Sequence, residues 1–280
     1  MIIDFHSHIL PGIDDGAKTW TDFLEISQLA AAAGITHMVC TPHFIYKEVE
    51  FKPETYYRLL SEARYKLREQ GLNISLISGS EVFYVPKLLF CLKEGLIITI
   101  NNGNKYLMVE FARFDIPNNV GETITMLKNQ GITPIIAHPE RNLAFSNEPE
   151  LLIKLIKRGA LSQLNVGSIV GEYGDKIRKT AELFLKSGII HLLGSDVHSP
   201  KNAFRNFNLG METIERLVGV KMTIELKDIN PLKIIKGDML EPYFIELKYK
   251  KSFLKIDPNN IKRNLKELLR GGKDLNGPSW

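Results

Sequence analysis

The 280-residue sequence predicts an α/β fold in which seven strand–helix units form a closed or nearly closed parallel barrel. Short apolar runs alternate along the chain with longer amphipathic stretches. The runs consist mostly of Ile, Val, Leu and Met, which is typical of parallel strands that are covered on both faces. Five of the amphipathic stretches end at a glycine that is closely followed by an apolar run, as helices leading into strands do.

The seven apolar runs give the predicted strands in order. They are residues 2–5, 35–40, 74–77, 106–111, 132–137, 161–166 and 189–193. The first helix is expected to be capped by Thr19 or Thr21 and to end at Ala33, before Gly34. The next begins with Pro53, which suits the first turn of a helix, and continues to residue 70. Further helices are predicted over residues 120–129, 149–158 and 173–186.

The pattern changes after Ser195. Residues 202–217 and 230–237 predict two more helices. Residues 243–256 alternate apolar and charged side chains like an exposed strand, and residues 259–270 predict an amphipathic helix. We therefore expect a domain of residues 1–242 and a C-terminal extension of residues 243–280, whose role the sequence does not indicate and whose end is expected to fray.

Composition and charge exclude several classes of protein. Apolar residues make up 44% and charged residues 24%, so the chain is not disordered, collagen-like or held together by disulfides. Without a long uncharged apolar run or a secretory signal, we expect a cytoplasmic protein with no membrane span. The net charge of +4 is mild, and the absence of zinc-finger, RNA-binding and recognition-helix patterns argues against a nucleic-acid partner.

Histidines and acids stand where the predicted strands end, and in a parallel barrel those ends meet at one rim. Buried imidazoles and carboxylates can share a rim if divalent cations neutralise the charge and accept the nitrogen lone pairs. Mixed nitrogen and oxygen ligands without cysteine fit Mn²⁺, Fe or Zn²⁺, and the share of acids favours Mn²⁺. So many ligands suit two or three ions. In strand order the residues are His6, His8, His43, Glu81, Glu110, His138, Asp196 and His198.

The motifs around these residues resemble a known family. The opening run Asp-Phe-His-Ser-His-Ile-Leu-Pro-Gly-Ile-Asp-Asp-Gly-Ala, residues 4–17, is similar to the start of the bacterial capsule-associated (CpsB/CapC-like) protein-tyrosine phosphatases of the PHP superfamily. Thr-Pro-His, Gly-Ser-Glu, His-Pro-Glu-Arg and Gly-Ser-Asp-Val-His follow in the order of the family, and residues 230–237 are similar to its closing motif. The resemblance covers about residues 1–242.

The resemblance implies a distorted (β/α)7 barrel with a metal centre at the C-terminal rim of the strands and manganese-dependent hydrolysis of phosphotyrosine. The implied substrate is an autophosphorylating bacterial tyrosine kinase that controls capsule or exopolysaccharide synthesis. Asp15 is preferred over Asp14 as a ligand because it stands immediately before Gly16. Motif matching assigns two ions to His6, His8, Glu81, Glu110, His138 and Asp196, and a third ion to Asp15, His43 and His198.

The phosphate-binding and catalytic roles are also predicted. Arg141 is expected to bind the substrate phosphate, because a planar guanidinium matches two phosphate oxygens. The family has a second arginine about five residues after its last histidine; Ala203 stands there in this chain, and Arg205 is the nearest candidate. The cations activate water for in-line attack, and His43 and His198 are candidate general acids only if they are not both fully committed to metal.

Two other functions stay open at this point. One is a small-molecule phosphomonoesterase of the same superfamily, similar to histidinol phosphatase. The other is a non-catalytic barrel that binds the kinase. A cysteine phosphatase is disfavoured, because neither Cys40 nor Cys91 is followed six residues later by arginine. Assembly into a homo-oligomer is also left open by the sequence.

Overall fold

The structure is a computed structural model, and it describes residues 1–243 of the chain. The helix predicted over residues 259–270 lies outside the described residues, as does the strand predicted over residues 243–256 except for its first residue. The described part is a mixed α/β fold with parallel sheets, which confirms that part of the predicted fold class.

All seven predicted strands are present, and their bounds differ from the prediction by a few residues. They are β1 (Ile3–Ser7), β2 (His37–Cys40), β4 (Ser75–Ser78), β6 (Tyr106–Glu110), β7 (Thr133–Ala137), β8 (Leu161–Asn165) and β9 (Leu192–Gly194). Two short strands were not predicted. They are β3 (His43–Phe44) and β5 (Glu81–Phe83), which follow β2 and β4 after two intervening residues.

The strands form two parallel sheets, with the orders β1–β2–β4 and β3–β5–β6–β7–β8–β9. The chain itself joins the sheets, because β2 leads into β3 and β4 leads into β5. At the other side, Ser7 of β1 pairs with Val197, and the His8 N–H donates to the Val197 carbonyl at 2.9 Å. Within residues 1–243 the paired strands do not make one continuous ring, so the structure does not show the predicted closed barrel.

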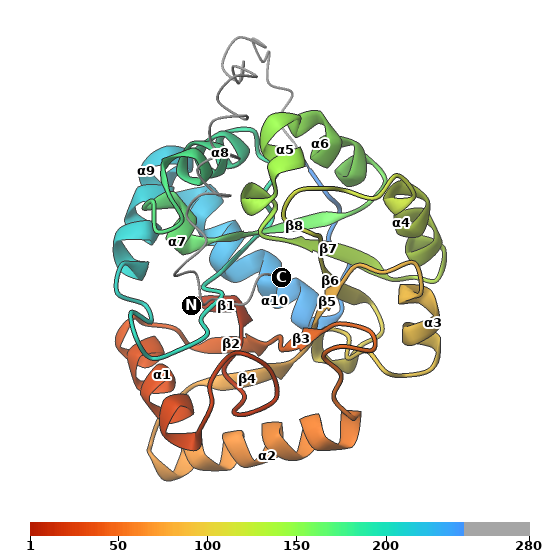
Figure 1. Cartoon of the computed structure of the whole chain (residues 1–280). Helices are drawn as coiled ribbons and strands as arrows, with labels where there is room; N and C mark the ends of the chain where they lie inside the picture. Colours follow the sequence, from red (N-terminus) through yellow and green to blue (C-terminus); the bar gives the residue numbers. More distant parts are fainter. Residues whose placement is uncertain (244–280) are drawn as a thin grey trace, which may run out of the picture. The chain divides into compact units, whose positions relative to one another are not determined.

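The helices lie around the outside of the strands (Figure 1). A capping box begins α1, because the Thr19 hydroxyl accepts from the Asp22 N–H and the Asp22 carboxylate accepts from the Thr19 N–H, as predicted for Thr19. The α-helices are α1 (Trp20–Ala32), α2 (Pro53–Glu69), α3 (Leu88–Lys93), α4 (Val120–Asn129), α5 (Leu143–Asn147), α6 (Pro149–Lys157), α7 (Val166–Ile169), α8 (Asp175–Lys186), α9 (Phe207–Ile224) and α10 (Asn230–Lys236). Short 3₁₀ or π turns are η1 (Ile100–Asn102), η2 (Pro139–Arg141) and η3 (Glu225–Ile229).

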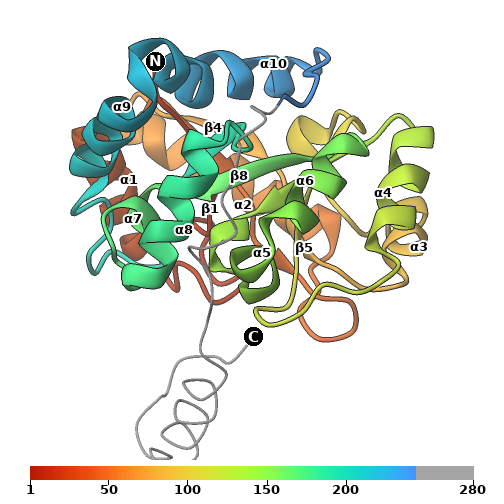
Figure 2. The ribbon, with the colours of Figure 1, turned by 90° about the horizontal axis from the view of Figure 1, so that it is seen from above.

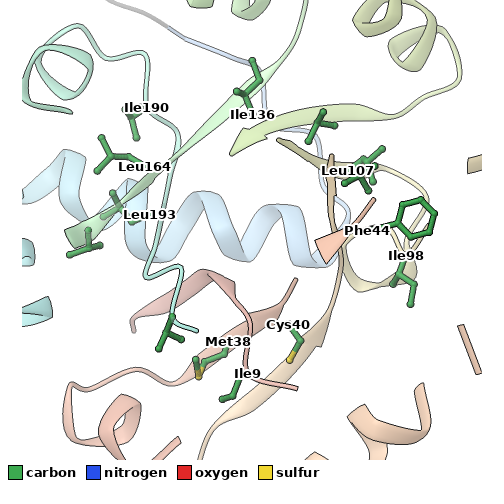
Figure 3. Packing of buried hydrophobic residues seen from close by; sticks show 14 of the residues in the cluster. Ile9, Met38, Cys40, Phe44, Ile98, Leu107, Ile136, Leu164, Ile190 and Leu193 are labelled. Carbon is green, nitrogen blue, oxygen red and sulfur yellow. The ribbon is translucent and has the colours of Figure 1, made fainter. Parts of the chain in front are cut away.

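Alternation along the strands divides the core into two clusters. The larger cluster packs the strands against the surrounding helices, and Figure 3 shows Met38, Leu107, Ile136 and Leu164 of this cluster. The smaller cluster consists of residues that alternate with these along the strands and therefore lie on the opposite faces. Its strand members are Ile3, Phe5, Val39, Tyr106, Met108, Ile135, Ala137, Leu161 and Leu192.

Helix α10 lies across one end of the strands (Figure 2). Its Ile234 belongs to the smaller cluster and packs there together with residues of the strands. The contacts identify this end as the start of the strands: the Tyr106 hydroxyl, at the first residue of β6, donates to the Asp238 carbonyl at 2.6 Å. The Met1 ammonium lies 3.1 Å from the Asp228 carboxylate. The carboxyl ends of the strands therefore face the other way, away from α10.

Among residues 1–243, none of the helices has the length and apolar character needed to cross a membrane. Both cysteines, Cys40 and Cys91, are free and buried.

Candidate metal centre

The residues predicted to bind metal ions lie in one cluster at the carboxyl ends of the strands. Three groups in this cluster each place ligand atoms within 4.8 Å of one another. One difference from the predicted division concerns His8, which was assigned with His6 but also joins the predicted third-ion set. The groups are His6, Glu81, His138 and Asp196; His8, Asp15, His43 and His198; and His43, Glu81 and Glu110.

Four atoms converge at the centre of the cluster. His6 Nε2 lies 3.0 Å from His8 Nε2. Glu81 Oε2 lies 3.1 Å from the first of these nitrogens and 3.3 Å from the second. Asp196 Oδ1 lies 3.4 Å from both. Ligand atoms that are each about 2.1 Å from one ion lie roughly 3 to 3.4 Å from each other, so these spacings fit a shared cation.

The cluster extends from this centre along β5, β6 and β7. His138 Nε2 lies 2.9 Å from Glu81 Oε1 and 3.6 Å from Glu110 Oε1. His43 Nδ1 lies 3.1 Å from Glu81 Oε2 and 4.0 Å from Glu110 Oε2. Glu81 is fully buried, and its carboxylate contacts histidines on both sides, namely His6, His43 and His138.

The group nearest to solvent contains Asp15, His43 and His198. Asp15 Oδ1 lies 3.5 Å from Nε2 of each histidine. The His198 ring stacks on the His8 ring with centroids 3.9 Å apart, which connects this group to the centre.

Asp14 has a different environment from Asp15. Its Oδ2 accepts from His8 Nδ1 at 2.7 Å and from the His43 N–H at 3.0 Å, and its Oδ1 accepts from the Gly16 N–H at 2.9 Å. It therefore orients two predicted ligands from behind. Gly16 is required for this turn, because a Cβ atom there would lie 2.1 Å from the His8 carbonyl oxygen. The geometry supports the choice of Asp15 over Asp14.

The partners of the Nδ1 atoms fix the histidine tautomers. His6 Nδ1 faces Gln163 Oε1 at 2.9 Å, His8 Nδ1 faces Asp14, and His198 Nδ1 faces the Asp196 carbonyl at 2.9 Å. Each of these partners accepts hydrogen bonds, so each Nδ1 carries a proton and each ring points its Nε2 atom into the cluster.

Strand β8 supplies hydrogen bonds and no predicted ligand. Gln163 Oε1 accepts from His6, and Gln163 Nε2 donates to Asn165 Oδ1 at 2.9 Å. Asn165 Nδ2 then donates to Asp196 Oδ2 at 2.8 Å. Buried Glu140 accepts from the Asn165 N–H at 3.1 Å. We call Gln163 and Asn165 the amide relay; the sequence analysis did not identify it, although two amides at alternate positions of a buried strand are a visible signal.

Asp4 positions the loop after β9. Its carboxylate accepts from the Ser195 N–H at 2.7 Å, from the Ser195 hydroxyl at 2.6 Å and from the His6 N–H at 3.3 Å. The Asp196 N–H donates to the His6 carbonyl at 2.8 Å, and Asp196 itself has a φ of 58°. These contacts hold β1 and the Asp196 loop against each other.

The charges of the cluster conflict when no cation is present. Burial and the nearby Glu81 carboxylate raise the pKa of Glu110 to about 8. Burial disfavours protonation of His6, but the charges of Glu81 and Asp196 outweigh it and raise the pKa of His6 to about 9. Without a cation, the negative charges of the cluster are therefore offset by protons on Glu110 and His6.

Arg141 lies beside Asp196 and donates to its Oδ2. Its guanidinium carbon is 4.7 Å from the centre of the Tyr173 ring. Arg205 is exposed, whereas Lys201 lines the cavity next to His198. The structure thus brings Arg141 to the cluster and leaves the predicted role of Arg205 untested.

The donor set fits divalent cations. Three buried atoms of the cluster, Asp15 Oδ1, His43 Nδ1 and Glu81 Oε2, have no hydrogen-bond partner among the described residues. Buried polar atoms are normally paired, so these atoms are available as metal ligands. With the Nε2 lone pairs of His6 and His8, they make a nitrogen and oxygen set without sulfur.

Comparisons with known proteins give a consistent result. A family model described as capsular polysaccharide synthesis, CpsB/CapC, matches residues 2–236. CapC from Staphylococcus aureus is 34% identical over 201 residues, which are 72% of this chain and 78% of CapC. The tyrosine-protein phosphatase YwqE from Bacillus subtilis is 30% identical over 207 residues, which are 74% of this chain and 80% of YwqE.

A solved structure also matches. It belongs to the crystal structures of YwqE from Bacillus subtilis and CpsB from Streptococcus pneumoniae, which are described as metal-dependent tyrosine phosphatases. The match has a TM-score of 0.82 at 25% identity, and it covers 88% of this chain and 100% of the matched chain.

Proposed function

Because the chain belongs to the CpsB/CapC family of capsular polysaccharide synthesis proteins, we propose that it is a metal-dependent protein-tyrosine phosphatase. It hydrolyses the phosphate monoester of phosphotyrosine. The substrate that best fits this role is an autophosphorylated bacterial tyrosine kinase that controls capsule or exopolysaccharide synthesis. We infer that it acts in the cytoplasm, which its two free cysteines support.

The observation that carries the proposal is the contact between His6 Nε2 and His8 Nε2 at 3.0 Å. Both Nδ1 atoms face acceptors and carry protons, so two uncharged rings here would turn their Nε2 lone pairs toward each other. A positive charge between or beside them, either a proton or a metal cation, removes this repulsion. Glu81 and Asp196 approach the same point, so the place suits a divalent cation better than a proton.

Charge balance supports three ions. The cluster contains five carboxylates and one guanidinium, which leaves about four negative charges when the histidines are neutral. Two divalent cations would balance these charges. A third would leave two positive charges, which match the roughly two negative charges of a phosphate monoester. The acid-rich donor set favours Mn²⁺, with Fe or Zn²⁺ as alternatives.

The residues have distinct roles in this proposal. When bound, the cations would polarise the phosphoryl group and lower the pKa of an attacking water. His6, His8, Glu81, Glu110, His138 and Asp196 would hold two ions, and Asp15, His43 and His198 the third, with His8 next to both sets.

Arg141 binds the phosphate oxygens through its guanidinium, for which Asp196 and the Tyr173 ring fix the position. His43 and His198, at the solvent side of the cluster, are the candidates for protonating the tyrosyl oxygen as it leaves, provided that they are not both committed to the third ion. Arg205 remains a proposed second phosphate contact. The strands that carry these residues would form the distorted (β/α)7 barrel, in which β2–β3 and β4–β5 each act as one bent strand.

The test is hydrolysis of a phosphotyrosyl peptide by purified protein with chelator and with Mn²⁺ added back. We expect activity that chelator abolishes and Mn²⁺ restores, and His138→Ala should remove it. His37→Ala is the matched control, since His37 lies at the start of β2, away from the cluster, and should keep full activity. Activity that is indifferent to chelator would refute the proposal.

The same assay separates the alternatives. Hydrolysis of histidinol phosphate at a rate equal to that of the peptide would favour a small-molecule phosphomonoesterase. Absence of turnover with either substrate, at saturating Mn²⁺, would favour a barrel that only binds its partner.

A further inference from the structure

A cavity of about 190 Å³ opens beside the metal centre. Asp196 and His198 form one side of it, so it is continuous with the place where the substrate phosphate would bind. Tyr173, Phe204 and Phe207 also line it, together with polar residues such as Lys201 and Asn202. The metal ligands and the phosphate-binding arginine account for the phosphate group only, which leaves the rest of the substrate without a binding site.

The aromatic walls have the arrangement that favours a further ring. The Phe204 and Phe207 rings meet edge to face, with centroids 5.6 Å apart and planes at 74°. Phe207 is buried, whereas Phe204 is half-buried and presents surface to the cavity. Aromatic rings attract one another in such offset and edge-to-face geometries. A cavity of about 150 Å³ lined by apolar side chains holds a benzene molecule, so the volume is sufficient for a phenyl ring.

Tyr173 connects this cavity to the phosphate site. Its ring lies 4.7 Å from the guanidinium carbon of Arg141, which also contacts Asp196. The neighbouring Glu172 is packed against Gly167: a Cβ atom on Gly167 would lie 2.2 Å from the Glu172 carboxylate. A phosphate held by Arg141 would therefore have an aromatic wall directly beside it.

The backbone that carries Phe204 is strained. Asn202 has a φ of 71° and Phe204 a φ of 55°, in the left-handed region. Asparagine tolerates this conformation, but a bulky aromatic residue rarely adopts it. Residues with strained backbone conformations are concentrated at ligand-binding sites, where the surrounding structure holds the side chain in a particular position.

We propose that this cavity, which we call the ring pocket, binds the aromatic ring of the phosphotyrosine side chain, with Phe204 as the residue that selects an aromatic leaving group. The inference rests on the proposed function, since it assumes that the phosphate binds at the metal centre. An aliphatic phosphomonoester would leave the ring pocket empty and would gain nothing from its aromatic walls.

The first test measures binding without turnover. Phenylphosphonate and methylphosphonate are titrated into the Mn²⁺-loaded protein by calorimetry. Wild-type protein should bind phenylphosphonate roughly fivefold or more tightly than methylphosphonate. The preference should vanish in Phe204→Ala and persist in Phe204→Tyr, which keeps a ring. Equal affinities in the wild type would overturn the proposal, whatever the variants do.

The second test uses turnover. The KM for a phosphotyrosyl peptide should rise at least fivefold in Phe204→Ala, while inhibition by inorganic phosphate, which has no ring, stays within twofold. Tyr65→Ala is the matched control, because Tyr65 is an exposed aromatic residue on α2. An unchanged KM, or loss of phosphate inhibition in parallel with KM, would overturn the ring pocket. Failure of the wild type to hydrolyse the peptide would instead refute the proposed function, and the phosphonate preference would still be decided separately.

Discussion

Replacement of Gln163 by leucine tests whether the amide relay holds the metal ligands in place. Gln163 is fully buried on β8; its side chain joins His6 to Asn165 and also accepts from the His138 N–H at 3.4 Å. Leucine has a similar volume, so the core around β8 stays filled. The change removes the acceptor of the His6 Nδ1 proton and the donor to Asn165 Oδ1.

Two effects follow from the structure, and they differ in size. The ring Nδ1–H of His6 and the side-chain Oδ1 of Asn165 would both be buried without these partners, which lowers the free energy of unfolding by about 1–3 kcal/mol each. Without its acceptor, the His6 ring is also free to rotate and to change tautomer. Loss of a hydrogen bond behind a metal-binding histidine typically lowers metal affinity roughly 10–100-fold. Gln163→Glu keeps the acceptor for His6, so its loss of affinity should be smaller.

The measurement is Mn²⁺ affinity by competition with a chromophoric chelator, with thermal melting in EDTA recorded alongside. Ser162→Ala is the matched control, because Ser162 is buried on the same strand and bonds to His191 and the Ile189 carbonyl instead. It should lower the melting temperature and leave Mn²⁺ affinity unchanged. Wild-type affinity in Gln163→Leu would show that the relay does not position the ligands.

Three further predictions concern single residues. Arg141→Lys keeps the charge but loses the planar fork, so KM for phosphotyrosyl peptide should rise roughly tenfold; an unchanged KM would exclude Arg141 as the phosphate ligand. Asp15→Asn should weaken Mn²⁺ binding more than Asp14→Asn does, because the amide oxygen in Asp14→Asn can still accept the hydrogen bond from His8 Nδ1. A larger loss of affinity in Asp14→Asn would mean that Asp14 is the ligand and Asp15 the supporting residue. Burial lowers the pKa of His191 to about 4 from an ordinary value near 6.5. The unfolded chain therefore binds one more proton between these pH values, and acidification through this window should lower the free energy of unfolding by up to about 1.4 kcal/mol per pH unit. Urea unfolding should show a shallower pH dependence for His191→Gln, and equal slopes would contradict the assignment.

The fold was predictable where burial alone decides the structure. Apolar runs gave all seven main strands, and caps and glycines gave most of the helix ends. The sequence did not reveal β3 and β5, because they are short and follow breaks at Pro42 and Gly79, after which the pairing resumes: the Glu81 N–H donates to the Pro42 carbonyl at 3.0 Å. Helix α9 begins five residues later than predicted and continues past Gly219, which has a φ of 82°.

The candidate site was predictable to the extent that one topological rule applies. Side chains that follow parallel strands meet at one rim, so the residues named from strand ends do lie together in the structure. This rule does not say in which direction each side chain points. It could not separate the inward Asp15 from the supporting Asp14, since both lie in the same turn and only the contacts with His8 and His43 distinguish them.

The amide relay shows what kind of sequence signal was available and overlooked. Acids at positions 163 and 165 would also accept hydrogen bonds from neighbouring ligands, but each would add a negative charge beside Glu81 and Asp196. That addition would increase the repulsion that already raises the pKa of Glu110. Amides orient the same ligands while remaining neutral, and they donate as well as accept, so they can connect a histidine to a carboxylate. A buried parallel strand that ends in amides, between strands that end in histidines and acids, therefore indicates a strand that positions ligands without contributing any.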